Sequence, residues 1–204
     1  MEAKKISKSV LKRLPGYLAY LKSLPENGPA HISATALANA LGMGEVQVRK
    51  DLACISKTGR QKVGRPRKLL IQDIENYLDL ATKTGAVVVG IGNLGQALLE
   101  YSGFAEFGMS ILAGFDIQPA GKFSKTGKPI YSMNRLRSFC RAHEVSIGVI
   151  TVPAESAQDV CDRMVECGIK AIWNFAPAHL MVPDHVIVQN ENLAVSLTSL
   201  RIQS

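Results

Sequence analysis

A run of valines that leads into a glycine-rich turn constrains the fold of this chain more than any other feature. Val87-Val88-Val89 precedes the motif Gly90-x-Gly92-x-x-Gly95, and an apolar helical pattern, Leu94 to Tyr101, follows it. In such a strand-turn-helix unit, the first glycine permits a tight turn and the second lets the backbone approach a pyrophosphate. The third lets helix and strand pack closely, with the phosphates at the helix N-terminus. We therefore expect an α/β domain that binds a dinucleotide.

An acidic residue supports the same site and indicates which dinucleotide it takes. The predicted second strand, Ile111 to Phe115, ends at Asp116, which lies 21 residues after Gly95. A carboxylate at this spacing fits a hydrogen bond from the 2′-hydroxyl of the adenosine ribose. It would repel a 2′-phosphate, and no arginine follows it closely. NAD or NADH is therefore expected in preference to NADP.

The rest of the second half alternates strands and helices, as a Rossmann-like, doubly wound parallel sheet requires. The expected strands lie near Lys128 to Tyr131, Ser146 to Val152, Ile169 to Trp173 and Val186 to Gln189; one helix ends near His143 and another covers Glu155 to Cys167. In such folds ligands lie at the carboxyl ends of strands, which points to the segments 151–153 and 174–177. The alternative is that both segments are only stiff turns. The candidate nucleotide site comprises Gly90, Ile91, Gly92, Asn93, Leu94, Gly95, Asp116, Ile117, Thr151, Val152, Pro153, Asn174 and Phe175.

The positive charge of the chain is confined to its first part. Residues 1–80 hold 14 lysines and arginines against 7 acidic residues, whereas residues 81–204 hold 10 of each. The whole net charge of +7 therefore belongs to the N-terminal segment. This asymmetry is typical of a nucleic-acid-binding module beside a neutral globular domain. The alternative is a basic surface that is merely solvated.

Two helices are expected before residue 42. Pro15 can begin the first, because its missing amide hydrogen costs nothing in the first helical turn. The apolar stripe of this helix comprises Tyr17, Leu18, Leu21 and Leu24. Ser33 is the expected N-cap of the second helix, which carries Leu37 and Leu41. Gly42 is expected to end it in a left-handed conformation.

A third helix, which starts near Glu45, has the character of a DNA-recognition helix. Its buried face is predicted to contain Val48, Leu52 and Ile55 at i, i+4, i+7 spacing. The opposite, polar face comprises Gln47, Lys50, Cys54 and Lys57, with Arg49 beside it. Two short helices around a glycine turn match the motif whose second helix enters the major groove. The alternative is a purely structural helical hairpin.

A basic segment after this helix has the composition of a wing. Residues 57–68 contain six basic residues and no acidic one, interrupted by two glycines and a proline. Gly64-Arg65-Pro66-Arg67 resembles the core of AT-hook peptides, so we expect both arginines to enter a narrow minor groove. The alternative is a basic loop that contacts only phosphates. The candidate DNA-binding residues are Ser33, Gln47, Arg49, Lys50, Lys57, Arg60, Lys62, Arg65 and Arg67.

Two further helices are expected outside these motifs. An amphipathic helix after the wing would close the small domain with Leu69, Leu70, Ile74 and Leu78. The chain ends in a helix whose apolar stripe comprises Leu193, Leu197 and Leu200. Such a terminal stripe is either a dimerisation element or packs on its own domain.

Taken together, these motifs closely resemble the Rex family of redox-sensing transcriptional repressors over nearly the whole chain. The segments that carry the resemblance are Val48 to Leu52, Gly92 to Leu98, Tyr101 to Phe104, Phe115-Asp116, Thr151 to Pro153 and Asn174 to Pro177. The resemblance implies a homodimer that binds palindromic operator DNA while NAD prevails and leaves it when NADH binds. It also implies N-terminal winged-helix domains (1–80), Rossmann-like domains (81–190) and exchanged C-terminal helices (191–204). By the same resemblance, Tyr101 would belong to the cofactor-binding residues, as a redox-responsive contact at the dimer interface.

The chain departs from the family pattern at two places. The wing of the family usually reads Arg-Gly-x-Gly-Tyr, where this chain has Gln61-Lys62-Val63-Gly64-Arg65. The usual Asp-Phe before the exchanged helix is Asn192-Leu193, and the chain ends several residues early. Operator sequence and the coupling between nicotinamide redox state and dimer geometry are therefore expected to differ from the family norm.

Other functional classes are disfavoured by composition. The chain shows neither a membrane-length apolar run nor a signal-peptide core, so a cytoplasmic location is expected. Its four cysteines form no CxxC pair, which argues against a metal site or a disulfide framework. An NAD-dependent dehydrogenase is disfavoured because no histidine has a convincing acidic or lysine partner; only His179 lies near a candidate loop. A DNA-binding protein whose Rossmann domain binds another nucleotide, such as coenzyme A, or only dimerises, remains the other alternative.

Overall fold

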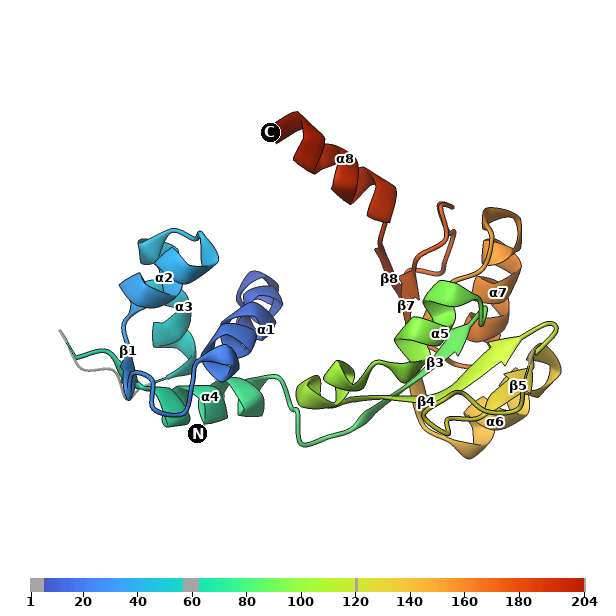
Figure 1. Ribbon diagram of the computed structural model, residues 1–204, viewed down its shortest axis with the longest axis horizontal. Helices are drawn as coiled ribbons and strands as arrows, with labels where there is room; N and C mark the ends of the chain where they lie inside the picture. Colours follow the sequence, from blue (N-terminus) through green and yellow to red (C-terminus); the bar gives the residue numbers. More distant parts are fainter. Residues whose placement is uncertain (1–5, 57–62, 120, 204) are drawn as a thin grey trace. The chain divides into compact units, whose positions relative to one another are not determined.

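The chain divides into two compact units, which we describe separately. In the computed structural model, residues 6–56, 63–119 and 121–203 are described (Figure 1). The N-terminal unit covers Met1–Thr82 and the C-terminal unit Lys83–Ser204. No helix in the described ranges is both long and apolar enough to cross a membrane.

The N-terminal unit contains the expected helix-turn-helix. Its elements are α1 (Lys8–Ser23), β1 (His31–Ile32), α2 (Ala34–Leu41), α3 (Glu45–Ile55), β2 (Arg65–Pro66) and α4 (Arg67–Tyr77). The Ser33 hydroxyl caps α2 by accepting a hydrogen bond from the amide of Ala36, at 3.0 Å. Gly42 ends α2 with φ of 62°, a left-handed conformation that favours glycine, and α3 follows after a short turn. The prediction of two helices around a glycine turn is therefore confirmed.

The core of this unit follows most of the predicted helical periodicity, although Leu24, Leu41 and Leu78 are only half-buried. Fully or nearly fully buried apolar residues come from all four helices; they include Leu14, Tyr17, Leu18, Leu21, Leu37, Val48, Leu52, Ile55, Leu70 and Ile74. The prediction for Leu69 was wrong, because its side chain is exposed. Leu69 precedes Leu70 directly, and adjacent residues on a helix point in different directions, so both cannot face one core.

The expected start of the first helix at Pro15 was also wrong. Helix α1 begins at Lys8, where Ser7 caps it, and Pro15 lies inside the helix. A proline at this position removes a backbone hydrogen bond and costs about 3 kcal/mol. However, Val10 and Leu14 are buried before it, and burial of each aliphatic side chain contributes about 1.5–3 kcal/mol. Packing of the first two turns therefore outweighs the cost of the proline.

The described residues of the C-terminal unit form a six-stranded, fully parallel sheet. Its strands are β3 (Thr84–Val89), β4 (Met109–Asp116), β5 (Ile130–Ser132), β6 (Val145–Ile150), β7 (Ala171–Asn174) and β8 (Ile187–Asn190). Their order across the sheet is β5-β4-β3-β6-β7-β8, so the chain starts in the middle and winds outward in both directions. This is the doubly wound order of dinucleotide-binding domains, and it places a crevice between the carboxyl ends of β3 and β6. The predicted doubly wound parallel sheet is confirmed.

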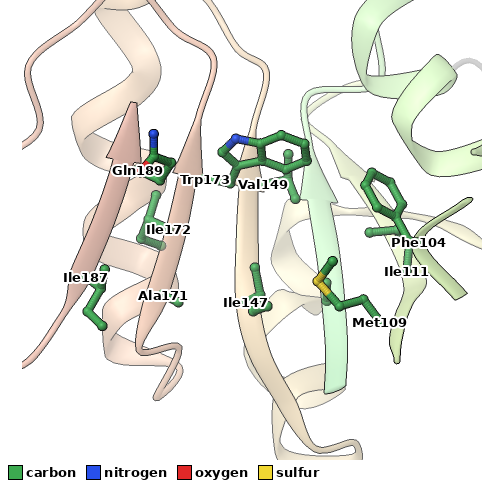
Figure 2. Close-up of a pocket in the computed structure, with 11 residues that line it drawn as sticks. Phe104, Met109, Ile111, Ile147, Val149, Ala171, Ile172, Trp173, Ile187 and Gln189 are labelled. Carbon is green, nitrogen blue, oxygen red and sulfur yellow. The ribbon is translucent and has the colours of Figure 1, made fainter. Parts of the chain in front are cut away.

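Helices cover the two faces of the sheet unequally. One face packs against α6 (Leu136–Ala142) and α7 (Ala154–Glu166) through a large apolar core centred on residues such as Phe115, Val160 and Met164. The other face packs against α5 (Asn93–Glu100) and the 3₁₀ helix η1 (Ser102–Phe107). Further along this second face lies an apolar hollow of about 310 Å³, into which side chains of several neighbouring strands project (Figure 2). We call this surface the open sheet face.

The last helix, α8 (Leu193–Gln203), is exposed wherever its side chains are described. Asn192 caps it, because its Oδ1 accepts a hydrogen bond from the amide of Val195 at 3.0 Å. Its large apolar side chains, Leu193, Val195, Leu197 and Leu200, are each more than half exposed. The helix therefore does not bury its apolar residues within the described chain.

Candidate nucleotide and DNA-binding sites

The three glycines after β3 differ in their surroundings as the motif requires. Gly90 has φ of 94°, and a Cβ there would lie 2.7 Å from Val152 Cγ1 and 2.8 Å from the Thr151 carbonyl oxygen. A Cβ on Gly95 would collide with the carbonyl oxygen of Gly90, because α5 packs closely against the end of β3. Gly92, in contrast, is the N-cap of α5, and a Cβ there would have no atom within 4 Å. Its open side is where a pyrophosphate can approach the helix N-terminus.

A threonine at the end of β6 braces this turn. The Thr151 hydroxyl lies 3.0 Å from the carbonyl oxygen of Val89 and 2.7 Å from that of Gly90. The single hydroxyl proton is shared between these two acceptors, which belong to the end of β3 and the first glycine. Thr151 therefore joins the two central strands at the crevice and holds the glycine turn in position.

Asp116 lies beside the same turn, at the carboxyl end of β4. Its Oδ2 accepts a hydrogen bond from the amide of Ile91 at 2.7 Å, and its Oδ1 accepts one from the amide of Gln118 at 2.9 Å. Each carboxylate oxygen has a second lone pair that a ribose hydroxyl can use. The carboxylate is thus oriented by the backbone and retains capacity for a ligand.

A cavity of about 490 Å³ joins these groups. Its lining residues are Val89, Gly90, Gly92, Asp116, Ile117, Met133, Thr151, Val152, Pro153, Ser156, Asp159, Val160 and Arg163. Glycine-turn residues, the ribose candidate and the segment after β6 therefore lie around one space. Sequence reasoning missed the residues from α7. Ser156, Asp159, Val160 and Arg163 recur at i, i+3, i+4, i+7 spacing, which marks one helix face and was the available signal.

Arg163 adds a cation that sequence reasoning did not place near Asp116. Its Nη2 lies 3.5 Å from the carbonyl oxygen of Met133, and its Nη1 lies 4.0 Å from Asp159 Oδ2. The cavity thus contains two carboxylates, Asp116 and Asp159, and one guanidinium. The prediction that the site rejects NADP was based on residues close to Asp116 in sequence. Arg163 lines the same cavity from a distant part of the chain, so titration with NADPH tests that prediction directly.

The candidates at the end of β7 lie apart from this cavity lining. Asn174 is fully buried, and the two protons of its side-chain amide are shared among three acceptors, the carbonyl oxygens of Ala176 and Ala178 and Asn190 Oδ1. Its Oδ1 accepts from the amide of Ala176 at 3.0 Å. These bonds shape the loop after β7 and join it to β8. His179, the one histidine considered for catalysis, is exposed and lies outside the lining of the cavity.

Tyr101 and Phe175 belong to an aromatic series on the open sheet face. Tyr101 is more than half exposed and meets Phe104 edge-on, with ring centroids 5.0 Å apart. Phe104 in turn meets Trp173 at 5.9 Å, and Trp173 meets Phe175 at 4.6 Å. The structure thus places both residues beside the open sheet face, not in the cavity lining.

Helix α3 of the N-terminal unit presents a polar face to solvent. Gln47, Arg49, Lys50 and Cys54 are all accessible, whereas Val48, Leu52 and Ile55 are buried, as the spacing predicted. Arg49 forms an ion pair with Glu45 one turn earlier on the same helix. The pair is solvent-exposed, so Arg49 remains accessible together with Gln47 and Lys50.

The arginines of the candidate minor-groove segment are partly engaged within the unit. Arg65 is half-buried, and its Nε has no hydrogen-bond partner among the described residues; burial also lowers its pKa from the ordinary value. Arg67 begins α4 and donates from Nη1 to the carbonyl oxygen of Pro25, at 2.7 Å. Gly64 has φ of 86°, and a Cβ there would lie 2.6 Å from the Ile32 carbonyl oxygen. Lys57, Arg60 and Lys62 lie outside the described residues, so the wing hypothesis stays a prediction.

Both units match known protein families. Residues 81–178 match the family described as "CoA binding domain", and residues 5–53 match the family described as "Putative DNA-binding protein N-terminus". These two matches coincide with the doubly wound domain and with the helix-turn-helix.

Several relatives match almost the whole chain. A curated protein of Porphyromonas gingivalis, named redox-sensing transcriptional repressor Rex, is 38% identical over 95% of this chain and 89% of its own length. One of the same name from Clostridium perfringens is 40% identical over 98% of this chain and 95% of its own length. Among solved structures, RSP in complex with NAD⁺ and operator DNA has a TM-score of 0.86 at 33% identity, covering 98% of this chain and 93% of RSP. RSP in complex with NADH has a TM-score of 0.82 at 33% identity, covering 98% and 94%.

Proposed function

Because the chain belongs to the Rex family of redox-sensing transcriptional repressors, we propose that it is a cytoplasmic homodimer that represses transcription from palindromic operators and leaves them when NADH binds. The N-terminal unit supplies the DNA contacts, and the C-terminal unit supplies the nucleotide site. NAD occupies the same site in the repressing state.

The cavity around the glycine turn carries this proposal. It combines an open helix N-terminus at Gly92 with a backbone-oriented carboxylate at Asp116. A pyrophosphate fits the helix N-terminus, and a ribose diol fits the carboxylate. NADH and NAD have both of these groups in common. The same chain presents an accessible polar face on α3, as a protein that reads the major groove requires.

The proposed switch needs only a difference in affinity between two arrangements of one dimer. Recognition helices of a dimeric helix-turn-helix protein contact successive major grooves, about 34–36 Å apart. NADH must favour an arrangement in which the helices no longer match that spacing. A tenfold loss of operator affinity corresponds to about 1.4 kcal/mol of coupling. By linkage, operator DNA weakens NADH binding by the same factor.

Two apolar surfaces support the homodimer. The side chains of α8 that would normally form a core are exposed, and the open sheet face leaves apolar groups such as Ile147 and Trp173 beside a hollow (Figure 2). Exposed contiguous apolar surface marks protein–protein contact. We infer that a second copy covers both surfaces and that α8 is exchanged between subunits.

Replacing apolar residues of α8 by aspartate will disrupt this dimer. We expect the Leu197→Asp, Leu200→Asp variant to sediment as a monomer, because two carboxylates cannot be buried unpaired in an apolar interface. Thr198→Asp, which adds a charge at an exposed polar position on the side of the helix away from Leu193, Leu197 and Leu200, is the control and should remain dimeric. A double variant that keeps the wild-type mass in sedimentation equilibrium would contradict the role of α8.

Asp116→Asn tests the assignment of the ribose contact. The amide oxygen can still accept from the backbone of Ile91, so the bond to the glycine turn is kept, while the negative charge and the bond from Gln118 are lost. A hydrogen bond to a charged group is worth about 1.5–3 kcal/mol, so NADH affinity should fall by roughly 10- to 100-fold. NADPH should bind this variant better than it binds the wild type, because the repulsion of its 2′-phosphate is removed. Calorimetric titration that shows unchanged NADH and NADPH affinities would refute the assignment.

Coenzyme A is the competing ligand, since residues 81–178 match a family described by CoA binding. Calorimetry on the wild-type protein with NADH, NAD, NADPH and coenzyme A distinguishes the two possibilities. Selective binding of NADH and NAD supports redox sensing. Preferential binding of coenzyme A would show that the protein responds to coenzyme A and does not sense the NADH/NAD ratio.

A further inference from the structure

A buried carboxylate lies on the helix that we assign to DNA recognition. Asp51 follows Lys50 on α3, yet its side chain is buried, with 3% of the residue exposed. An acidic side chain on a DNA-facing helix would repel phosphates if it pointed outward. Its burial therefore calls for partners that make the inward position favourable.

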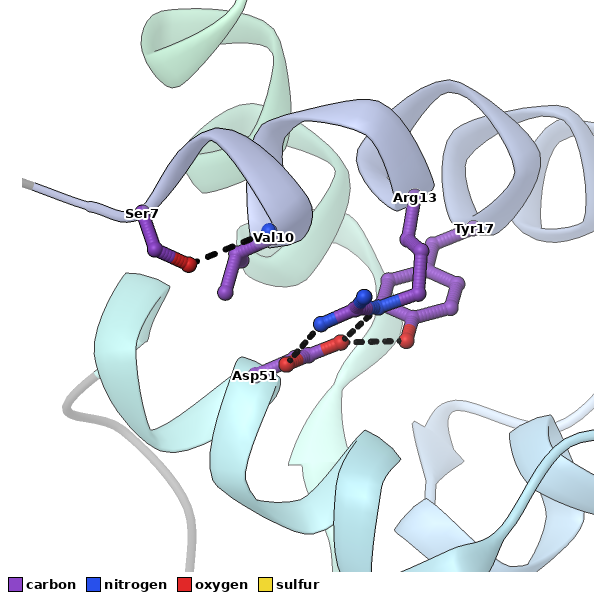
Figure 3. Close-up of polar contacts among 5 residues, drawn as sticks. All are labelled: Ser7, Val10, Arg13, Tyr17 and Asp51. Carbon is purple, nitrogen blue, oxygen red and sulfur yellow. Dashed lines mark hydrogen bonds and ion pairs between the residues drawn. The ribbon is translucent and has the colours of Figure 1, made fainter.

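Two residues of α1 supply those partners (Figure 3). Arg13 donates to both carboxylate oxygens, from Nε to Oδ2 at 2.7 Å and from Nη2 to Oδ1 at 2.8 Å. The hydroxyl of Tyr17, one helical turn later, donates to Oδ2 at 2.7 Å. Asp51 is thus held by a two-pronged guanidinium and a phenol that come from one face of α1. We call these three residues the α1–α3 network.

The protonation states of the α1–α3 network are fixed near neutral pH. Burial alone would raise the pKa of Asp51, but hydrogen bonds from Arg13 and Tyr17 outweigh it and leave the pKa below its ordinary value. Burial, together with the hydrogen bond to Asp51, raises the pKa of Tyr17 to about 12. The carboxylate is therefore charged and the phenol protonated, so all three hydrogen bonds persist under physiological conditions.

Stability alone is a weak reason for such a network. Well-packed apolar residues of similar volume often stabilise a protein as much as a buried ion pair does. A bidentate pair differs from apolar packing because its geometry is directional: a rotation or slide of α3 against α1 would break two hydrogen bonds at once. The α1–α3 network therefore selects one orientation of α3, whereas leucine-like packing would tolerate several.

We propose that Arg13, Tyr17 and Asp51 are positioning residues for operator recognition. They hold α3 in the rotation that presents Gln47 and Lys50 to the major groove, and they keep the Asp51 carboxylate away from the phosphates. This inference rests on the proposed function, because it requires that α3 reads DNA. The property that the α1–α3 network controls is the discrimination between DNA sequences, more than the stability or the charge of the protein.

The test compares discrimination between DNA sequences with stability. The wild-type protein is first used to enrich duplexes from a random-sequence library. Each variant is then measured for its affinity for the enriched duplex and for a scrambled duplex at fixed salt, and for its thermal midpoint. We expect Arg13→Met, Asp51→Leu to fold and to bind NADH like the wild type. Its ratio of specific to nonspecific affinity should fall by about tenfold or more, since specificity typically spans about 10³–10⁷ and depends on docking geometry.

A matched control removes another ion pair of the same helix. Lys22 Nζ lies 2.8 Å from Glu75 Oε1, and this pair joins α1 to α4, not to α3. Lys22→Met, Glu75→Leu should therefore keep the wild-type affinity ratio. Arg13→Lys keeps the charge but loses the two-pronged geometry, and Tyr17→Phe keeps the ring but loses one hydrogen bond. Both should lower the ratio while leaving nonspecific affinity unchanged.

The outcomes separate positioning from stability. A folded Arg13→Met, Asp51→Leu variant with the wild-type ratio would overturn the proposal and leave the α1–α3 network a purely structural feature. If that variant fails to fold, Arg13→Lys and Tyr17→Phe provide the test. A wild-type ratio of specific to nonspecific affinity in both variants would also overturn the proposal. Failure of the wild-type protein to enrich any duplex would instead refute DNA recognition by α3, which is a distinguishable result.

Discussion

Gly92→Val protein is expected to fold and bind operator DNA normally, yet to stay bound when NADH is added. Gly92 has φ of −77° and ψ of −166°, extended values that valine adopts readily, and no atom lies within 4 Å of the new Cβ. The valine side chain would instead occupy the space through which the pyrophosphate approaches α5. We expect NADH affinity to fall by about 100-fold, which corresponds to about 2.8 kcal/mol. The variant would thus be a repressor that ignores NADH.

Gly121→Val is the matched control for this substitution. Gly121 lies in the same unit, is exposed, and a Cβ there would approach only the Phe123 carbonyl oxygen, at 3.9 Å. It should retain both NADH binding and NADH-dependent release. Wild-type release by Gly92→Val protein, at wild-type NADH concentrations, would show that the nucleotide does not lie over the glycine turn.

Gln47→Ala, Lys50→Ala protein is expected to lose most of its operator affinity while it binds NADH normally. Glutamine contacts adenine with two hydrogen bonds, and each good contact of this kind is worth about 1–3 kcal/mol. Lysine contributes mainly through a phosphate, so its loss should also reduce the salt slope of binding by about 1. Together we expect roughly a 100-fold loss of operator affinity. Titration of labelled duplex at several salt concentrations measures both quantities.

Lys170→Ala controls for the loss of a positive charge. Lys170 is exposed, lies in the C-terminal unit and follows Ile169 at the edge of the loop before β7. Its substitution should leave operator affinity and salt slope nearly unchanged. If Gln47→Ala, Lys50→Ala protein bound the operator as tightly as the wild type, α3 would not be the recognition helix.

Local patterns in the sequence predicted the doubly wound sheet and the glycine turn well, because both depend on neighbouring residues. The three glycines after Val89 each face the constraint that their position in the motif predicted: a left-handed φ at Gly90, open space at Gly92 and close packing at Gly95. The alternation of apolar strands and helices was sufficient to predict the fold class. The glycine turn and each strand or helix depend on about ten neighbouring residues. Over that length, apolar periodicity and turn residues predict the local structure.

Features that depend on distant partners could not be predicted in the same way. Arg13 and Asp51 are 38 residues apart, so no local spacing indicates their hydrogen bonds. Arg163 reaches the cavity only because α7 packs against the sheet at β6 and so lines the same space as Asp116, which is a tertiary arrangement. Pro15 was placed at a helix start because proline is favoured there, but burial of Val10 and Leu14 extends α1 past it. In each case packing outweighed the local preference on which the prediction was based.

Release of operator DNA by nicotinamide dinucleotides tests the proposed function most directly. The wild-type protein would be bound to a labelled palindromic duplex, enriched from random sequences, at fixed salt, and then titrated with NADH, NAD and NADPH. We predict release by NADH, with NAD and NADPH leaving the complex intact at the same concentrations. Tight DNA binding that is indifferent to all three nucleotides would contradict redox sensing by this chain.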